Sequence, residues 1–109
     1  MTEDISKDEL KAKIDGGEDF QLVDVRGKEC CYDNGHIPGA ISMPLNELEE
    51  RAPRELDRDK LVVVYCGSYT CTLSPRAAHM LKHHLGFKKV LDYSGGIKEW
   101  QESGLPVEK

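Results

Sequence analysis

The chain has 109 residues, of which 39% are hydrophobic and 32% charged, with 15 Lys and Arg against 20 Asp and Glu, for a net charge of −5. This apolar content is far above that of a disordered acidic tail, and the length suits one domain over residues 1–109 with a modest core that needs no disulfide or metal. The acidic balance and the lack of a Lys/Arg-rich run argue against nucleic acid or an anionic membrane as a main partner.

The sequence also lacks a membrane span, since no stretch approaches the roughly 20 apolar residues that one requires. Residues 1–10 are polar and acidic, without the apolar core of a signal peptide. We therefore expect a cytoplasmic protein.

The first half of the chain shows two helical and two strand-like patterns. A capping-box spacing opens the first helix, apolar β-formers indicate the strands, and Leu/Ala periodicity indicates the second helix. These are a helix from Ser6 to Gly16, a strand at 20–25, a brief strand at 40–43, and a helix with Leu45, Leu48 and Ala52 that Pro53 closes.

The second half contains the strand expected at the centre of the sheet. Residues 61–65 are continuously apolar and β-branched, which is typical of a strand covered on both faces. A helix should follow, with Ser74 as N-cap, Pro75 in its first position and Gly86 as its stop, then a strand at 90–93 and a helix at 97–103. This alternation predicts an α/β fold with a largely parallel sheet.

Four cysteines are too few for a disulfide scaffold, and none has C-x-x-C spacing. Cys66 follows the central strand, and ligands of parallel sheets collect at the carboxyl ends of strands. The loop behind it should aim backbone N–H groups and a helix end at one spot, favouring a thiolate and holding an anion. The alternative is that Cys66 is a small buried hydrophobe. The loop residues expected to bind substrate are Gly67, Ser68, Tyr69, Thr70, Cys71, Thr72 and Leu73.

Several segments occur in the order and spacing of one known family. They are VDVR at 23–26, GHIPGAI at 35–41, VYC at 64–66, GF at 86–87, GGIKEW at 95–100 and GLPV at 104–107. Together they resemble the single-domain rhodaneses over nearly the whole chain. The resemblance implies a central five-stranded sheet with helices on both faces.

The resemblance also implies sulfur transfer, with Cys66 at the catalytic position. Its thiolate would take the outer sulfur of thiosulfate, polysulfide or a persulfide, and pass it from a Cys66 persulfide to a thiol, cyanide or a thioredoxin-like acceptor. Loop amides stabilise such sulfur anions, and no cofactor or metal is implied. If those amides face Cys66, its pKa should fall below the ordinary value of about 8.5.

The loop departs from the family pattern, which places Arg and then Ser or Thr after a cysteine and four residues. This chain has Cys71-Thr72 there, and Arg76 is the nearest arginine, able either to reach back over the pocket or to face solvent. Thiosulfate should therefore be a poor donor. Phosphatases and arsenate reductases of this fold also use a loop arginine. Because this loop has none, an enzyme of either kind is the less favoured alternative. A non-catalytic binding or regulatory module is the other alternative.

Cys71 offers different chemistry, because a second thiol near the nucleophile can resolve its persulfide as a disulfide; the alternative is loop packing. Cys30 and Cys31 are expected to be surface thiols, since adjacent cysteines rarely bridge each other.

Other conspicuous residues have structural interpretations. Asp24 and Arg26 match a family pair that ties the first strand's end to nearby loops, with a lesser chance that Arg26 lends positive potential to the pocket. His36 should satisfy backbone groups in its turn, and Trp100 should anchor the last helix. His79 and His83 have i, i+4 spacing that can hold a metal, but a solvated helix face is favoured.

Overall fold

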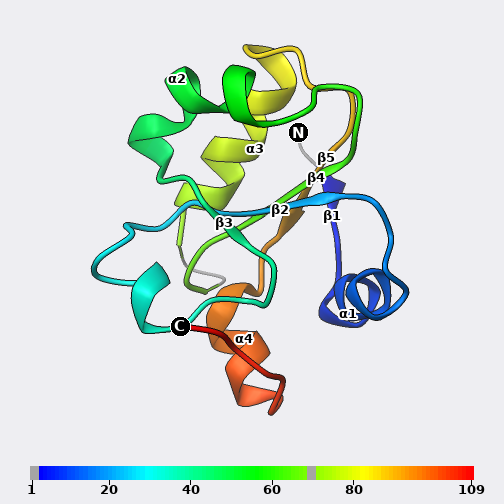
Figure 1. The fold of residues 1–109 in the computed structure, drawn as a ribbon, viewed down its shortest axis with the longest axis vertical. Helices are drawn as coiled ribbons and strands as arrows, with labels where there is room; N and C mark the ends of the chain where they lie inside the picture. Colours follow the sequence, from blue (N-terminus) through cyan, green and yellow to red (C-terminus); the bar gives the residue numbers. More distant parts are fainter. Residues whose placement is uncertain (1–2, 69–70) are drawn as a thin grey trace.

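A sheet with the strand order β1-β5-β4-β2-β3 forms the centre of the molecule, and every neighbouring pair of strands is parallel (Figure 1). The computed structural model describes residues 3–68 and 71–109. This five-stranded parallel sheet confirms the predicted fold class. Its strands are β1 Glu3–Asp4, β2 Gln21–Asp24, β3 Ile41–Ser42, β4 Val62–Tyr65 and β5 Val90–Tyr93.

Strand β4 lies in the middle of the sheet, as its continuous apolar sequence predicts. All four of its residues are buried. Side chains alternate between the two faces of a strand. Val62, Val64 and the following Cys66 join one apolar cluster, while Val63 and Tyr65 join the other. The chain thus delivers Cys66 to the carboxyl edge, on a defined face of the sheet.

Helices cover both faces of the sheet (Figure 1). Helices α2 and α3 pack on the face that Val64 and Cys66 share, and α1 and α4 pack on the face of Tyr65. The helices are α1 Lys7–Asp15, α2 Leu45–Glu55, α3 Leu73–His83 and α4 Gly96–Glu102, with a 3-10 turn, η1, at Tyr32–Asn34.

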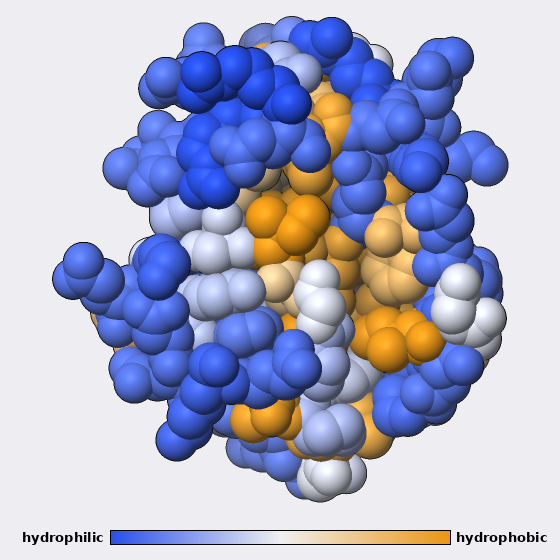
Figure 2. All heavy atoms as spheres, viewed as in Figure 1, coloured by the Kyte–Doolittle hydropathy of each residue, from blue (hydrophilic) through white to orange (hydrophobic). Residues whose placement is uncertain are grey.

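The outer surfaces of the molecule are mostly hydrophilic. Figure 2 shows apolar side chains gathered in the middle of one face, bordered by hydrophilic side chains. Among residues 3–68 and 71–109, no helix has the length and apolar composition that crossing a lipid bilayer requires.

Local sequence chemistry explains where α1 begins and where α2 departs from the prediction. The Ser6 side chain accepts a hydrogen bond from the Glu9 amide, and the Glu9 side chain accepts one from the Ser6 amide, which confirms the capping box. Pro53 does not close α2, which continues to Glu55. Proline fits helical φ and loses only one hydrogen bond, and the Leu56 amide still donates to the Ala52 carbonyl at 2.9 Å.

The prediction that Ser74 caps α3 is wrong, because α3 begins at Leu73 with Thr72 as its N-cap residue. The Ser74 side chain is buried and faces Cys66 instead of capping the helix. Helix α4 likewise begins one residue early, at Gly96. Both helix starts are therefore set by their contacts with the loop after β4.

Candidate active site

Cys66 lies directly after β4, where α4 fixes its backbone. The Ile97 amide donates to the Cys66 carbonyl at 3.0 Å, and the Lys98 amide donates to the Gly67 carbonyl at 2.9 Å. Gly96 makes this approach possible, because a Cβ there would lie 2.6 Å from the Cys66 carbonyl oxygen. The first turn of α4 thus holds the start of the loop in place.

The Cys66 thiol is buried, with a relative exposure of 1% for the residue. Its Sγ donates to the Ser74 Oγ at 3.4 Å, and the carbonyl oxygen of Cys71 lies 3.7 Å away. Ser74 is itself only 1% exposed. The first turn of α3 therefore presents a buried hydroxyl to the sulfur.

Cys71 is half-buried and its thiol lies beside that of Cys66. Burial opposes its ionisation, but hydrogen bonds from the Cys66 thiol and the Gly67 and Leu73 amides lower the pKa of Cys71. The positive charge of Arg26 acts in the same direction. The loop amides thus favour a thiolate at Cys71.

The predicted fall in the pKa of Cys66 is wrong. Burial raises the pKa of the Cys66 thiol, as does its hydrogen bond with Cys71, and the opposing hydrogen bonds from Ser74 are too weak to reverse this. The backbone hydrogen bonds of Gly67 and Leu73 act on the Cys71 sulfur instead, where they lower its pKa. Cys66 is the more buried and less acidic thiol of the pair.

Of the other loop residues predicted to bind substrate, Ser68 and Thr72 are among the described residues. The Cys71 amide donates to the Ser68 carbonyl at 3.0 Å, which curls the loop, and Thr72 begins α3. Tyr69 and Thr70 lie outside the described residues.

Arg76 is exposed and lines a groove between α2 and α3 with a volume of about 800 Å³. Leu73, Met80 and Leu45 supply apolar walls to this groove. Among the described residues, no hydrogen bond or ion pair brings the Arg76 guanidinium to Cys66. The structure therefore places Arg76 beside the loop, facing the groove.

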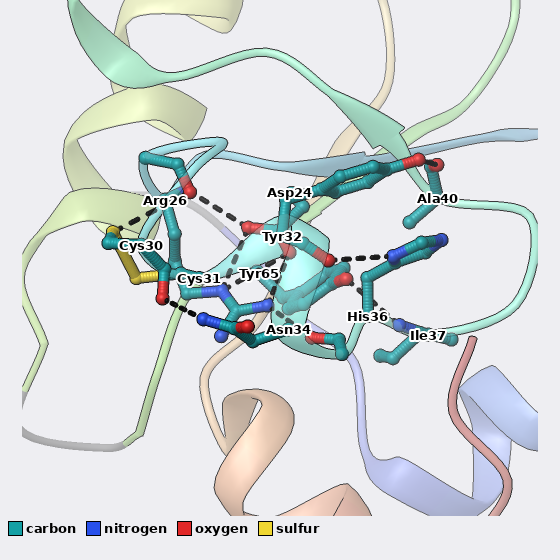
Figure 3. Close-up of polar contacts among 12 residues, drawn as sticks. Asp24, Arg26, Cys30, Cys31, Tyr32, Asn34, His36, Ile37, Ala40 and Tyr65 are labelled. Atoms are coloured by element: carbon teal, nitrogen blue, oxygen red, sulfur yellow. Dashed lines mark hydrogen bonds and ion pairs between the residues drawn. A yellow bond between two sulfur atoms is a disulfide. The ribbon is translucent and has the colours of Figure 1, made fainter. Parts of the chain in front are cut away.

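The Asp24–Arg26 ion pair lies at the end of β2 (Figure 3). Asp24 is fully buried, and the Arg26 Nη2 lies 2.7 Å from its Oδ2 and donates to the Gly35 carbonyl at 2.8 Å. The guanidinium also lies 6.0 Å from the centroid of the Tyr65 ring. These contacts confirm the tie between the end of β2 and the next loop, and Arg26 in addition favours the Cys71 thiolate.

His36 satisfies backbone groups, as predicted. Its ring Nδ1 lies 2.9 Å from the Tyr32 carbonyl oxygen (Figure 3), and its amide donates to the Glu108 carbonyl at 2.8 Å. Trp100 is 1% exposed and its indole donates to the Pro106 carbonyl, which confirms its anchoring role.

The expectation of unbridged surface thiols at Cys30 and Cys31 is wrong, because the structure joins them in a disulfide (Figure 3). The chain turns sharply here, with the Tyr32 amide donating to the Gly27 carbonyl at 3.1 Å. This turn brings the two neighbouring side chains together.

The histidines of α3 are exposed. The His79 ring lies 4.7 Å from the His83 ring and 5.6 Å from the His84 ring, measured between centroids. In the described parts of the chain, no three His, Cys, Asp or Glu side chains are arranged to hold a metal ion.

Two groups behind Cys66 escape prediction from the sequence. The pattern indicates only a helix cap at Ser74 and only a strand position at Asp92, yet Asp92 is a carboxyl that is 2% exposed. The available signal is a charged residue inside the otherwise apolar strand β5.

Comparison with known proteins agrees with this geometry. The rhodanese-like domain family matches residues 6–103. The HTH-type transcriptional regulator Rv0324 of Mycobacterium tuberculosis is 40% identical over 105 residues, which cover 96% of this chain and 44% of that protein. A sulfurtransferase of Allochromatium vinosum is 31% identical over 107 residues, which cover 98% of this chain and 95% of that protein.

A solved structure shows the same fold. The crystal structure of the BH2092 protein from Bacillus halodurans matches with a TM-score of 0.90 at 33% identity, covering 98% of this chain and 77% of that one. The chain spans less than half of the regulator and nearly all of the sulfurtransferase. With its family match over residues 6–103, the chain belongs to the rhodanese-like domains.

Proposed function

We propose that the protein is a sulfurtransferase that carries sulfane sulfur as a persulfide on Cys66. The observation that carries this proposal is the position of the Cys66 thiol at the carboxyl end of β4, with the Ser74 hydroxyl and the Cys71 thiol beside it. Membership of the rhodanese-like family and the similarity to a protein named sulfurtransferase support a role in sulfur transfer.

The proposed cycle has two displacements at sulfur. The Cys66 thiolate attacks the outer sulfur of the donor, forming a sulfur–sulfur bond to Cys66 while the donor's own sulfur–sulfur bond breaks. Thiosulfate leaves as sulfite, and an organic persulfide leaves as its thiolate. The acceptor then attacks the outer sulfur and restores the Cys66 thiolate; cyanide would leave as thiocyanate. No net oxidation of the protein occurs.

The loop favours donors with less charge than thiosulfate. Neither Cys71 nor Thr72 can supply the guanidinium that would hold a sulfonate group in a bidentate way. We therefore propose polysulfide or an organic persulfide as the preferred donor, and a thiol or thioredoxin-like dithiol as the acceptor. We place this chemistry in the cytoplasm, where cellular thiols would keep Cys66 and Cys71 reduced.

Cys71 fits a second role in the same site. Its lowered pKa makes it a competent attacking thiolate, and it lies next to the Cys66 sulfur. Attack of the Cys71 thiolate on the Sγ of a Cys66 persulfide would form a Cys66–Cys71 disulfide and release hydrosulfide. A cellular dithiol would then reduce that disulfide.

Intact-mass measurement after exposure to one equivalent of polysulfide tests the sulfurtransferase proposal. We expect the mass of the chain to increase by one sulfur atom, and we expect this adduct to be absent in Cys66→Ser. Addition of a thiol acceptor should remove the sulfur from the chain and produce the persulfide of the acceptor. A chain with both Cys30→Ser and Cys31→Ser is the matched control, because it removes the two cysteines outside the loop after β4 and should keep the adduct.

A binding or regulatory module is the competing function. The raised pKa of Cys66 and the similarity to a protein named as a transcriptional regulator favour it. Absence of both a Cys66 adduct and a Cys66–Cys71 disulfide with polysulfide, an organic persulfide and thiosulfate alike would overturn the sulfurtransferase proposal in favour of this one.

A further inference from the structure

The groove between α2 and α3 is a cavity to which the proposed function assigns no occupant. Its volume of about 800 Å³ lies within the range of sites that bind small organic molecules. The two helices lie next to each other on the same face of the sheet (Figure 1). Cyanide, sulfide and thiosulfate are far too small to fill this space. The groove therefore has room for the organic group of a larger sulfur compound.

One end of the groove adjoins the proposed persulfide carrier. The Cys66 Sγ donates to the Ser74 Oγ at 3.4 Å in the first turn of α3, and Leu73, the residue before Ser74, lines the groove. Val25 also lines it, and its amide donates at 3.1 Å to the carbonyl of the residue that precedes Cys66. Cys71 packs against the same apolar cluster as Leu73. A ligand in the groove can therefore present a sulfur atom to the loop.

The walls of the groove are largely aliphatic. Leu73 and Met80 line it from α3, and Leu45 lines it from α2. All three side chains are half-buried and pack against the apolar cluster of this face. Two helical turns separate Leu73 from Met80, so these residues lie on one side of α3, about 10 Å apart along its axis. The walls therefore suit an aliphatic group that extends away from the loop.

Arg76 places one cation on the same side of α3. It follows Leu73 by three positions, which puts it about 4.5 Å further along the helix axis. Within the described structure its guanidinium makes no hydrogen bond or ion pair, whereas every other arginine does. Those contacts are Arg26 with Asp24, Arg51 with Glu47 and Glu55, Arg54 with Glu50, and Arg58 with the Leu85 carbonyl. The Arg76 guanidinium is therefore available to an anionic ligand.

The other polar groups of the groove leave this cation unpaired. Glu49 on α2 supplies the carboxylate among the described lining residues, and it makes no ion pair with Arg76 in that part of the chain. His79 and His84 line the groove further from the loop. A guanidinium binds a carboxylate through two parallel hydrogen bonds. The groove can therefore bind a carboxylate close to the loop.

The order of these groups along α3 restricts the chemistry of the ligand. The Cys66 sulfur lies at Ser74, the cation of Arg76 follows two residues later, and the apolar side chain of Met80 follows six residues later. In a straight-chain mercapto acid, the carboxylate lies at the far end of the carbon chain. In an N-acylated cysteine, the carboxylate lies within a few bonds of the thiol and the acyl chain extends separately. The second arrangement matches the groove.

We propose that the groove binds an N-acylcysteine-type thiol, which accepts the sulfur carried by Cys66. Its carboxylate binds Arg76 and its acyl chain lies between Leu45 and Met80. This inference rests on the proposed Cys66 persulfide. The ligand thiolate attacks the outer sulfur and forms a sulfur–sulfur bond, while the bond from that sulfur to Cys66 breaks and its electron pair stays on Cys66. The products are the ligand persulfide and the Cys66 thiolate, and no external oxidant or reductant takes part.

Binding is tested without sulfur chemistry by N-hexanoyl-alanine, which lacks the thiol. We expect changes in amide NMR shifts at groove residues such as Leu45, Leu73 and Met80. N-acetyl-alanine should bind at least about tenfold more weakly, because its acyl group buries less apolar surface. Arg76→Gln should weaken binding of N-hexanoyl-alanine about fivefold, the upper end for an ion pair at an exposed site. Arg54→Gln is the matched control, since Arg54 does not line the groove.

Transfer is tested in chains that carry Cys71→Ser, so that Cys71 cannot remove the sulfur, after one equivalent of polysulfide has loaded Cys66. N-hexanoyl-cysteine and its uncharged amide are added separately, and intact mass follows the loss of the adduct. Arg76→Gln should lower the ratio of the two rates about fivefold, and Arg54→Gln should leave it unchanged. The intrinsic reactivities of the two thiols cancel in this comparison. Met80→Gln should reduce the advantage of N-hexanoyl-cysteine over N-acetyl-cysteine.

The outcomes separate this inference from the sulfurtransferase proposal. Equal binding of the hexanoyl and acetyl probes, or a ratio of rates that Arg76→Gln and Arg54→Gln change alike, overturns it. If Met80→Gln does not fold, as judged by circular dichroism, the two exposed arginine variants decide. Binding of N-hexanoyl-alanine in the groove, without a Cys66 adduct or a Cys66–Cys71 disulfide in the parent chain, retains the groove as a carboxylate site and rejects sulfur transfer. Transfer with no preference for N-hexanoyl-cysteine does the reverse.

Discussion

Cys66 and Cys71 share one loop but have opposite properties. Burial raises the pKa of Cys66, whereas hydrogen bonds from the Cys66 thiol and two loop amides outweigh burial and lower the pKa of Cys71. Cys71, the more exposed residue, thus ionises more readily, and Cys66 is better shielded from solvent. This difference suits a division between a sulfur carrier and a resolving thiol.

At the scale of these two residues, Cys71→Ser should lengthen the life of the Cys66 persulfide. The resolving thiolate is absent, so the persulfide sulfur leaves only by transfer to an external acceptor. We expect at least about a tenfold slower loss of the adduct in buffer, by analogy with the rate advantage of a neighbouring group over one in solution. Intact mass followed over time measures the decay.

Tryptic peptide mapping of the same samples tests directly for a Cys66–Cys71 disulfide. Cys66 and Cys71 lie in one tryptic peptide between Lys60 and Arg76, so a bridge lowers the mass of that peptide by two hydrogens. An adduct that decays equally fast in both chains, with no bridged peptide in the parent chain, would show that Cys71 only packs in the loop.

Among the elements, the start of α4 is the most constrained by the site. Gly96 has φ +66°, and a Cβ on it would lie 2.6 Å from the Cys66 carbonyl oxygen and 2.7 Å from the Gly67 carbonyl carbon. The left-handed backbone and the close approach both favour glycine. Helix α4 therefore supports the carboxyl edge of β4 through backbone contacts.

Gly96→Ala should lower the free energy of unfolding by about 2–4 kcal/mol, combining left-handed strain with steric overlap. Denaturant unfolding measures the change. Gly104→Ala is the matched control, since Gly104 has φ +79° but a Cβ there would meet no atom within 4 Å, so only the strain of about 1–2 kcal/mol applies. Equal losses in the two variants would show that the contact with Cys66 is unimportant.

The predictability of the elements follows the strength of their local signals. Strand β4 has a continuous apolar run and α1 has a capping box, and both appear where expected. In the described part of the chain, strand β1 consists of Glu3 and Asp4, which are both exposed and pair with β5. No local pattern indicates such a strand.

The site was less predictable than the fold. Its position after β4 follows from the sheet, but the direction of the loop amides depends on the tertiary fold. The amides of Gly67 and Leu73 hydrogen-bond to Cys71, and Ser74 faces Cys66. Contacts of this kind depend on tertiary packing, and no periodic pattern in the sequence indicates them.

For the whole molecule, the ionisation of Asp92 should appear in the pH dependence of stability. Because burial raises its folded pKa, the native state binds more protons than the unfolded state between the ordinary carboxyl pKa and the raised one. The contribution of this group to stability is therefore full at acidic pH and is lost as the pH rises through that interval.

Asp92→Asn removes this dependence. We expect the stability of the parent chain, relative to that of the variant, to decline as the pH rises from the ordinary carboxyl range toward neutrality. Thermal unfolding of both chains over this range measures the difference, in which the other carboxyls cancel. A difference that is constant with pH, or that grows in favour of the parent, would contradict the raised pKa.

Within residues 3–68 and 71–109, the two outermost strands, β1 and β3, have two residues each. Short edge strands offer few unpaired backbone groups, and β1 adds two acidic side chains. Extended peptides that bind by β-augmentation need a longer exposed edge. Neither edge of this sheet therefore offers a long row of free backbone groups, and we expect a partner protein to recognise the chain through side chains and not by adding a strand.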